Sequence, residues 1–469
     1  MINPYRTDAL LPQPGMLVGR RTLIQASMFG AASWAALQGT AGKKVTASET
    51  LSGEIGFGRA KRCLLLFMWG GPSQLDTFDP KPEAPDAVRG PFKTIATNVP
   101  GINFSENFQL LSQRADKLAV IRSLGHDDPA HLSSGHTTLT GQLPPRNKSD
   151  AAPPSDRDTP HIGCVMSKLR PSLGALPSFV TVPWFAYHPA APGGQAPGQN
   201  SGWLGRQYDP LLAAGDPNTP GWQVPSLSLI EGQSPDRLLR RQNLLTLMDT
   251  QRRLVDEASM SRRLNAQQQQ AFGLLTSSSV RQAFDLEQES PETRDRYGRN
   301  THGQSVLLAR RLLDHGVPFV SVNWQNDGQN FWDTHGNNFN RLKNDLIPPS
   351  DRAFSAVLDD LEQSGQLNDT LVVWVGEFGR SPHINASVGR EHHPYCYCGV
   401  MAGGGIRGGQ VYGASDKHGA YPSDKPLTPH DLVATMYHAL GVAPGEVLHD
   451  GLNRPHQIVA GRPVRELFV

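Results

Sequence analysis

The stretch TLVVWVGEFGRSPHINASVGREHHP, residues Thr370–Pro394, joins a predicted buried strand to a group of polar side chains. Thr370–Val375 is aliphatic, aromatic and β-branched, which is typical of a strand buried on both faces. A glycine then leads directly to Glu377, and His392 and His393 follow after a loop broken by glycine and proline. A carboxylate that ends a buried strand needs a partner. Imidazoles arriving soon afterwards predict that this partner is a metal ion.

Apolar runs alternate with amphipathic segments along the rest of the chain. Arg62–Trp69, RCLLLFMW, is a continuous apolar run, which predicts another strand buried on both faces. Strands interleaved with helices predict an α/β fold, a doubly wound central sheet flanked by helices. Such sheets place their sites on polar residues just past the strand C-termini. Further strands are expected at Leu118–Ser123, Ser178–Val182 and Pro318–Trp324, and helices at Gln304–His315, Asp351–Ser364 and Thr428–Leu440.

Two segments interrupt this alternation. Asp236–Gln288 is charged, rich in glutamine and helical in period, so a helical insertion is predicted at about 230–295 within a domain spanning 46–469. His188–Gly205 is rich in glycine, proline and alanine. A loop of this length inside a compact domain is usually functional or a lid.

The overall charge excludes one class of partner. The chain has 469 residues and a formal net charge of +1 at pH 7. A nucleic-acid-binding protein would need a basic face. No nucleic-acid partner is therefore expected.

The N-terminal region resembles a targeting segment. Arg20 and Arg21 precede a mildly apolar run, Leu23–Leu37, which is too short and too polar to span a bilayer. An arginine pair before a weak apolar region resembles a bacterial twin-arginine export signal. Residues 1–45 are then signal and linker, the export machinery is a partner, and the protein is expected in the periplasm or at the cell surface. The alternative is a chance basic pair before an amphipathic helix.

The cysteines leave one question open. Cys63 lies in an apolar run and is expected in the core. Cys396 and Cys398 are too close together for an unstrained disulfide with each other. In an exported protein, Cys164 could pair with one of them.

Metal-capable side chains follow several predicted strands. They are Asp76, Asp333, His335, Glu377 and His392. Mixed carboxylate and imidazole ligands suit zinc, manganese or iron. Taken singly, Asp76 is equally a loop cap, and Asp333 with His335 an exposed turn pair. His393 is expected to be a neighbour of the site rather than a ligand.

Longer motifs resemble a known family. They include RCLLLFMWGGPSQLDTFDPKP from Arg62, HLSSGHTTLTGQLP from His131, WDTHGNNF from Trp332 and LVVWVGEFGRSPHIN from Leu371. Beyond the signal, the whole chain resembles the bacterial domain of unknown function 1501 family. That family is similar to the alkaline phosphatase and sulfatase superfamily. The resemblance implies one or two divalent metal ions at the C-terminal ends of the sheet, and a nucleophile at a helix N-terminus that attacks phosphorus or sulfur.

Carried over residue by residue, the resemblance implies that Asp76, Asp333, His335, Glu377 and His392 hold the metal. Phe378 stands where a phosphatase would have histidine, so a second metal site is expected to be depleted or absent. The nucleophile position falls on His131, and a small shift of the match brings in Ser133 or Ser134. His136 is a candidate for orienting the substrate. The alternative for both serines is simple capping of a helix.

These residues lead to two functional expectations. The first is an exported metal-dependent hydrolase of phosphate or sulfate esters, acting on a small anionic substrate that Arg380 and Arg390 clamp. Both arginines could equally be ion-pair partners of Glu377 or Glu391. No cysteine, and not Ser133, is followed by the residues of a formylglycine motif, so a formylglycine sulfatase is not expected. The second expectation is a non-catalytic binding or assembly protein that reuses the fold. The oligomeric state stays open.

Overall fold

The computed structural model describes residues 53–469, apart from 173, 228–236, 238–239, 241–270 and 325–330. The predicted export signal and linker at 1–45 lie outside the described residues. Most of the predicted insertion at about 230–295 lies outside them too. The described part of that insertion contains the helices α8 (Ser278–Phe284) and α9 (Pro291–Tyr297), with the short 3-10 helix η5 (Leu286–Gln288) between them.

The described residues form a central sheet of eight strands in the order β12-β4-β11-β8-β1-β7-β5-β6. β11 is antiparallel to both its neighbours, and every other neighbouring pair is parallel. The strands are β1 (Arg62–Phe67), β4 (Leu118–Leu124), β5 (Phe179–Val182), β6 (Leu211–Leu212), β7 (Phe319–Asn323), β8 (Thr370–Val375), β11 (Tyr397–Ala402) and β12 (Gln410–Tyr412). The predicted α/β class with a central sheet is confirmed, and the sheet is mostly parallel.

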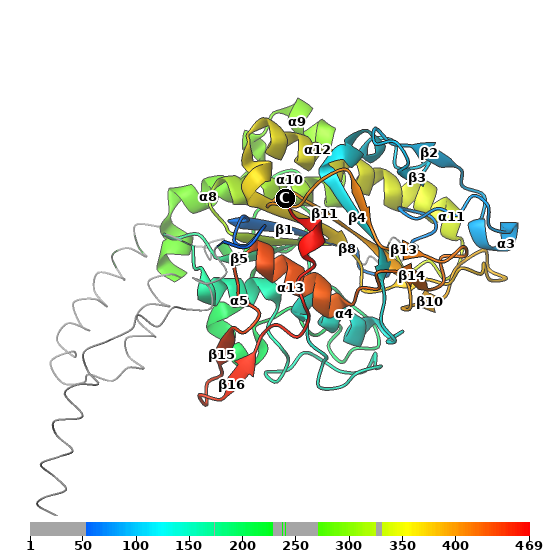
Figure 1. The fold of residues 1–469 in the computed structure, drawn as a ribbon. Helices are drawn as coiled ribbons and strands as arrows, with labels where there is room; N and C mark the ends of the chain where they lie inside the picture. The colour runs from blue at the N-terminus through cyan, green and yellow to red at the C-terminus, as the bar shows by residue number, and fades with distance from the viewer. Residues whose placement is uncertain (1–52, 173, 228–236, 238–239, 241–270, 325–330) are drawn as a thin grey trace, which may run out of the picture. The chain divides into compact units, whose positions relative to one another are not determined.

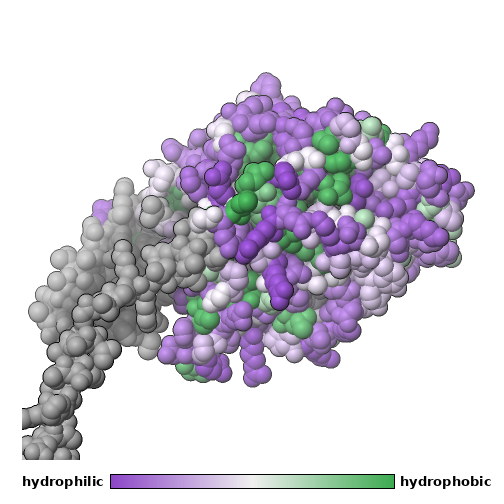
Figure 2. All heavy atoms as spheres, in the orientation of Figure 1, coloured by the Kyte–Doolittle hydropathy of each residue, from purple (hydrophilic) through white to green (hydrophobic). Residues whose placement is uncertain are grey.

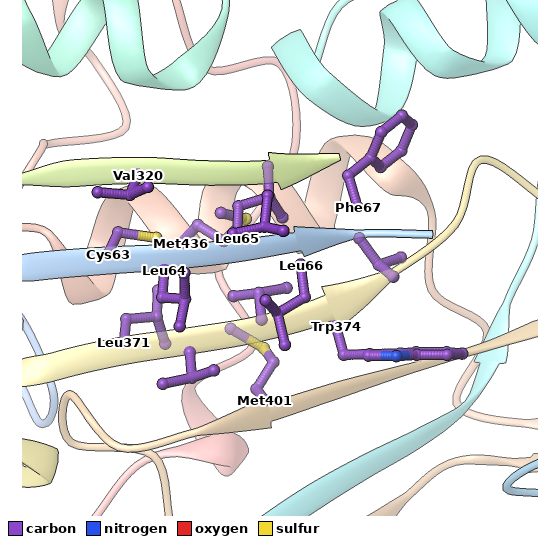
Figure 3. Packing of buried hydrophobic residues seen from close by; sticks show 14 of the residues in the cluster. Cys63, Leu64, Leu65, Leu66, Phe67, Val320, Leu371, Trp374, Met401 and Met436 are labelled. Carbon is purple, nitrogen blue, oxygen red and sulfur yellow. The ribbon is translucent and has the colours of Figure 1, made fainter. Parts of the chain in front are cut away.

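The apolar strand β1 lies inside the sheet, between β7 and β8. Leu65 is in register with Ser321 of β7 and Val373 of β8. Figure 3 shows the side chains of β1 packed among residues of β7, β8, β11 and α13. Leu64 and Leu66 are fully buried, and burying one such side chain stabilises the fold by about 2 kcal/mol. A strand covered on both faces has no polar face, which explains its continuous apolar sequence.

Helices cover both faces of this sheet (Figure 1). One layer contains α9, α10 (Thr301–Asp314) and α12 (Ile347–Gln363), and the other contains α4 (His131–Thr140), α5 (Ile162–Leu169) and α13 (Pro429–Ala439). The start of α13 follows from its sequence. Thr428 and Asp431 form a capping box, and Pro429 occupies the first turn, where its missing N–H costs nothing.

Smaller elements surround the sheet edges. They are the helices α3 (Asp86–Arg89) and α11 (Asn338–Arg341), the two-stranded pairs β2 (Thr94–Ala96) with β3 (Asn103–Ser105), β9 (Gly379–Arg380) with β10 (His392–His393), β13 (Ala414–Ser415) with β14 (Pro422–Asp424), and β15 (Val447–His449) with β16 (Pro455–Gln457). The β9–β10 pair brings His392 opposite Arg380.

Three further features concern the cysteines, the membrane and the surface. All four cysteines are free and buried, so the disulfide considered for Cys164 is not present. Among the described residues, no helix is both long enough and apolar enough to cross a membrane. Figure 2 shows a face on which hydrophilic side chains predominate and hydrophobic ones gather in separate groups, as is ordinary for a folded protein surface.

Candidate metal centre

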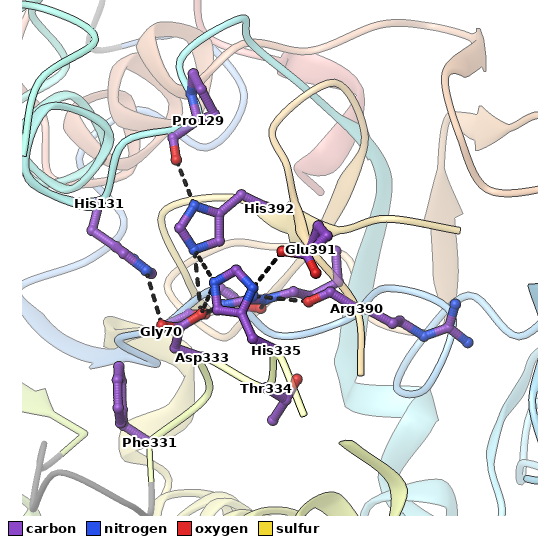
Figure 4. Close-up of polar contacts among 12 residues, drawn as sticks. Gly70, Pro129, His131, Phe331, Asp333, Thr334, His335, Arg390, Glu391 and His392 are labelled. Atoms are coloured by element: carbon purple, nitrogen blue, oxygen red, sulfur yellow. Dashed lines mark hydrogen bonds and ion pairs between the residues drawn. The ribbon is translucent and has the colours of Figure 1, made fainter. Parts of the chain in front are cut away.

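Three imidazoles surround the carboxylate of Asp333 beyond the ends of the parallel strands (Figure 4). His131 begins α4 after β4, Asp333 and His335 come after β7, and His392 lies in β10. Nε2 of His131 is 3.5 Å from Oδ2 of Asp333. The Nε2 atoms of His335 and His392 are 3.0 Å and 3.2 Å from Oδ1 of the same carboxylate. We call these four residues the His–Asp cluster.

Each imidazole of the His–Asp cluster is fixed through its other ring nitrogen, Nδ1. The acceptors are Oε1 of Glu377 for His131 (2.6 Å), Oε2 of Glu391 for His335 (2.6 Å) and the carbonyl oxygen of Pro129 for His392 (2.7 Å). Carboxylate and carbonyl oxygens only accept, so each Nδ1 carries the proton and donates it. Each Nε2 then presents a lone pair toward Asp333. Metal-bound histidines are held in this way by the groups around them.

The convergence of lone pairs fits a bound cation. Nε2 of His335 and Nε2 of His392 are only 2.9 Å apart, and Nε2 of His131 is buried without a hydrogen-bond partner. Buried polar atoms without a partner are rare in folded proteins. The ligand atoms of His131, Asp333 and His392 all lie within 4.8 Å of one another. Nitrogen and carboxylate donors of this kind suit zinc, manganese or iron.

The electrostatics of the His–Asp cluster favour a positive charge at its centre. Burial alone would raise the pKa of Asp333, but the Arg380 charge and the neighbouring imidazoles hold it well below its usual range. Burial alone would lower the pKa of His131, yet its contacts with Asp333 and Glu377 raise that pKa to about 9. Burial lowers the pKa of His392. The ionised Asp333 therefore attracts either a proton on His131 or a cation between the ligands.

Arg380 supports Asp333 from within the protein. Its side chain is fully buried, and Nη2 forms an ion pair with Asp333 and donates to the carbonyl oxygen of Gly70. Nε donates to Gly71 O at 3.0 Å, and Nη1 donates to Arg390 O at 3.1 Å. All three nitrogens are occupied by protein atoms. The structure thus presents Arg380 as a residue that positions Asp333, and it does not leave this guanidinium free to clamp a substrate.

Asp76 and Arg390 form a separate buried ion pair. Nε of Arg390 is 2.7 Å from Oδ2 of Asp76, and Nη2 is 3.1 Å from Oδ1. Asn338 donates a further hydrogen bond to Oδ2 of Asp76 at 3.0 Å. Neither Asp76 nor Arg390 has any exposed side-chain surface. Both residues predicted for the site are therefore committed to each other, and the structure does not bring Asp76 into the His–Asp cluster.

Glu377 contacts the His–Asp cluster through His131. Its carboxylate accepts hydrogen bonds from the backbone N–H of Gly70 at 2.9 Å and from His131. Glu377, which the sequence predicted as a metal ligand, thus fixes the tautomer of His131, a candidate ligand. The next residue, Phe378, packs its ring 4.8 Å from that of His131 and 4.6 Å from that of His392, between ring centroids. The position at which a phosphatase would have a histidine is thus occupied by the apolar ring of Phe378.

The other predicted residues of α4 do not join His131 in the cluster. The Ser134 hydroxyl donates to Asp128 O at 2.7 Å, and the Ser133 hydroxyl accepts from Ser149 N at 3.1 Å. His136 is buried, contacts Gln142 O at 3.2 Å, and burial lowers its pKa to about 4. The helix N-cap is Ala130 and makes no side-chain cap bond, so capping does not explain either serine.

Two side chains near the cluster were missed as site residues by sequence reasoning. Glu391 fixes His335, and it was considered only as an ion-pair partner of an arginine. His188, from the glycine- and proline-rich loop, has its ring centroid 5.4 Å from that of His131. Burial, and then the charge of His131, lower the pKa of His188. The unusual loop composition was the available signal for His188.

The sequence matches one family over nearly all of its described length. The family model described as "Protein of unknown function (DUF1501)" matches residues 60–468. No curated protein matches the sequence.

Solved structures show a likeness in architecture at low identity. The protein Ps i-CgsB is 11% identical with a TM-score of 0.41, and the match covers 87% of this chain and 76% of Ps i-CgsB. The PsFucS1 sulfatase from Pseudoalteromonas sp. is 14% identical with a TM-score of 0.37, covering 85% and 70%. The lipoteichoic acid synthase LtaP from Listeria monocytogenes is 9% identical with a TM-score of 0.36, covering 89% and 80%.

Proposed function

The chain belongs to the family of proteins of unknown function DUF1501, and we propose that it is an exported metal-dependent hydrolase of phosphate or sulfate esters. One observation carries the proposal: three imidazoles with anchored Nδ1 atoms turn their Nε2 atoms toward one ionised carboxylate. That donor set has no evident structural task, because it brings the Nε2 atoms of His335 and His392 within 2.9 Å of each other and leaves Nε2 of His131 without a hydrogen-bond partner. It has an evident task in holding a cation.

His131, Asp333 and His392 would hold the metal ion, with His335 beside them. When bound, zinc, manganese or iron supplies Lewis-acid polarisation of an ester oxygen. Glu377 keeps the proton of His131 on Nδ1, and Arg380 keeps Asp333 ionised and oriented. One group of possible ligands is found among the described residues, and Phe378 packs against it. We propose one metal ion rather than two.

The proposed substrate is a small anionic ester. A tetrahedral phosphate or sulfate group is attracted to a bound cation. The side chains of Arg380 and Arg390, which were predicted to clamp the substrate, are not available for this because protein atoms occupy both. Export is proposed from the sequence alone, on the pair Arg20 and Arg21. The twin-arginine machinery and a periplasmic or surface location are part of the same proposal.

A non-catalytic binding or assembly role is the alternative proposal, and one specific observation is consistent with it. The hydroxyls of Ser133 and Ser134, two of the three nucleophile candidates at the helix start, are held by backbone groups. An emptied phosphatase fold would tolerate this arrangement. A hydrolase in which water is the attacking group would tolerate it as well.

The test is a hydrolysis screen of the metal-reconstituted protein with aryl phosphate monoesters, diesters, phosphonates and sulfates. The matched variants are His131→Ala, which removes a ligand of the proposed metal, and His393→Ala, whose Nε2 contacts Ala420 O at 2.6 Å. The proposal expects turnover by the wild type and His393→Ala, and a loss of at least about 100-fold in His131→Ala. Metal-loaded wild type without turnover on any ester class would support the binding or assembly role.

A further inference from the structure

His188 approaches the His–Asp cluster from the side of the glycine- and proline-rich loop. Its ring is half-buried, and its centroid lies 5.4 Å from that of His131 with the planes tilted by 40°. Neither the family description nor the sequence motifs give this residue a role. Its position beside a ligand of the proposed metal suggests one.

The loop that carries His188 is held in place by buried amides. The side chain of Gln199 accepts from Ala186 N at 2.7 Å and donates to Ala186 O at 3.0 Å, which closes the base of the loop. Asn323, at the end of β7, donates to Gln199 Oε1 at 3.0 Å. Trp69, just past β1, donates from Nε1 to Tyr187 O at 2.9 Å. His188 is thus fixed to the same strand ends that carry the cluster.

The tautomer of His188 is opposite to that of the cluster imidazoles. The backbone N–H of Ala190 donates to His188 Nδ1 at 3.2 Å. An Nδ1 that accepts has no proton, so the proton of the neutral ring is on Nε2. Among the described residues, His188 Nε2 makes no hydrogen bond. The ring, whose centroid is 5.4 Å from that of His131, therefore has one donor unused.

This difference separates His188 from the metal ligands. A ligand nitrogen needs a free lone pair, and the only lone pair of the neutral His188 ring is already used by Ala190. A donor beside a cation can instead contact an anion that the cation holds. The oxygens of a phosphate or sulfate ester are acceptors and carry the charge that such a donor stabilises.

We infer that His188 is a substrate-binding residue whose Nε2–H donates a hydrogen bond to an oxygen of the tetrahedral anion held at the His–Asp cluster. The inference rests on the proposed function and names a residue that recognises the substrate. The loop is then part of the binding site, and Gln199 and Asn323 are positioning residues for it.

The experiment measures the binding of inorganic phosphate and sulfate to the zinc- or manganese-reconstituted full chain by calorimetry, together with metal content. Two variants are compared with the wild type: His188→Leu removes the donor, and His188→Gln keeps an N–H in a similar place. His188→Leu is expected to weaken anion binding by about 10- to 100-fold, the usual effect of losing a hydrogen bond to a charged acceptor. His188→Gln is expected to stay within about threefold of the wild type, and metal content is expected to be unchanged in both.

Three outcomes would overturn the inference, and they can be told apart. Equal anion affinity in His188→Leu and the wild type leaves the proposed hydrolase standing without a role for His188. Loss of metal in His188→Leu makes His188 a metal ligand. An absence of anion binding by the metal-loaded wild type counts against the proposed function and this inference together. Thermal unfolding of both variants near the wild-type temperature shows that the fold is intact.

Discussion

Arg390 holds Asp76 in a bidentate ion pair, with Nε 2.7 Å from Oδ2 and Nη2 3.1 Å from Oδ1, and both side chains are fully buried. An aspartate that follows the first strand thus has a structural partner from a loop more than 300 residues further along the chain. The pair links the segment after β1 to the segment that presents His392. Asp76 is in this way connected to the proposed metal site without being one of its ligands.

Replacing Asp76 with Asn should therefore lower stability and leave metal binding in place. Removing one partner of a buried pair leaves the other charge uncompensated, which costs about 3–5 kcal/mol. Urea denaturation of the metal-free protein measures this loss, and elemental analysis measures metal content. A variant that loses its metal while keeping wild-type stability would make Asp76 a ligand.

Replacing Glu377 with Gln should weaken metal binding without abolishing it. The carboxylate fixes His131 through Nδ1 at 2.6 Å, and loss of such a supporting group typically lowers metal affinity by about 10- to 100-fold. Competition with a chelator of known affinity gives the change. Glu391→Gln is the matched control, because Glu391 supports His335 but has 57% of its side chain exposed. If both substitutions lowered metal affinity equally, the proposal that His131 contributes more than His335 to metal binding would be contradicted.

The raised pKa of Asp351 predicts that the stability of the protein depends on pH. Its carboxylate accepts from Leu110 N at 2.8 Å and from Leu111 N at 2.7 Å, yet burial raises its pKa from 3.8 to about 6. The folded protein then binds more protons than the unfolded chain between about pH 4 and 6. Below about pH 4, the protonated Asp351 contributes about 3 kcal/mol at most to the free energy of unfolding. This contribution is lost as the pH rises to about 6.

The Asp351→Asn variant tests this dependence. Its free energy of unfolding should vary less between about pH 4 and 6 than that of the wild type, because the titrating group is gone. Urea denaturation at several pH values in that window provides the comparison. If the two proteins show the same slope with pH, the raised pKa of Asp351 is contradicted.

The sequence predicted the five inner parallel strands of the sheet, and it missed the short parallel edge strands β6 and β12. The apolar runs at Arg62–Trp69 and Thr370–Val375 became β1 and β8, because strands buried on both faces have no polar face to obscure the signal. The antiparallel strand β11, Tyr397–Ala402, was missed. Cys396 and Cys398, just before and within its start, were considered only for a disulfide, whereas the structure buries both thiols in or beside the core.

The sequence predicted the candidate metal ligands better than it predicted the roles of the residues around them. Asp333, His335 and His392 were identified from residue type and position after strands, and the structure brings them together with His131. The roles of Asp76, Glu377, Arg380 and Arg390 depend on partners far away in the sequence, and residue type does not reveal these partners. A buried carboxylate needs a positive or donating neighbour, but only the fold decides whether that neighbour is a metal, an imidazole or a guanidinium.

The most direct test of the proposed metal site is the metal content of the purified protein, measured by elemental mass spectrometry for the wild type, His392→Ala and His393→Ala. The two histidines are adjacent, but His392 Nε2 faces Asp333 at 3.2 Å while His393 Nε2 contacts Ala420 O at 2.6 Å. We expect about one equivalent of zinc, manganese or iron in the wild type and in His393→Ala, and a large loss in His392→Ala. No metal in the wild type after reconstitution, or equal metal in all three proteins, would contradict the site.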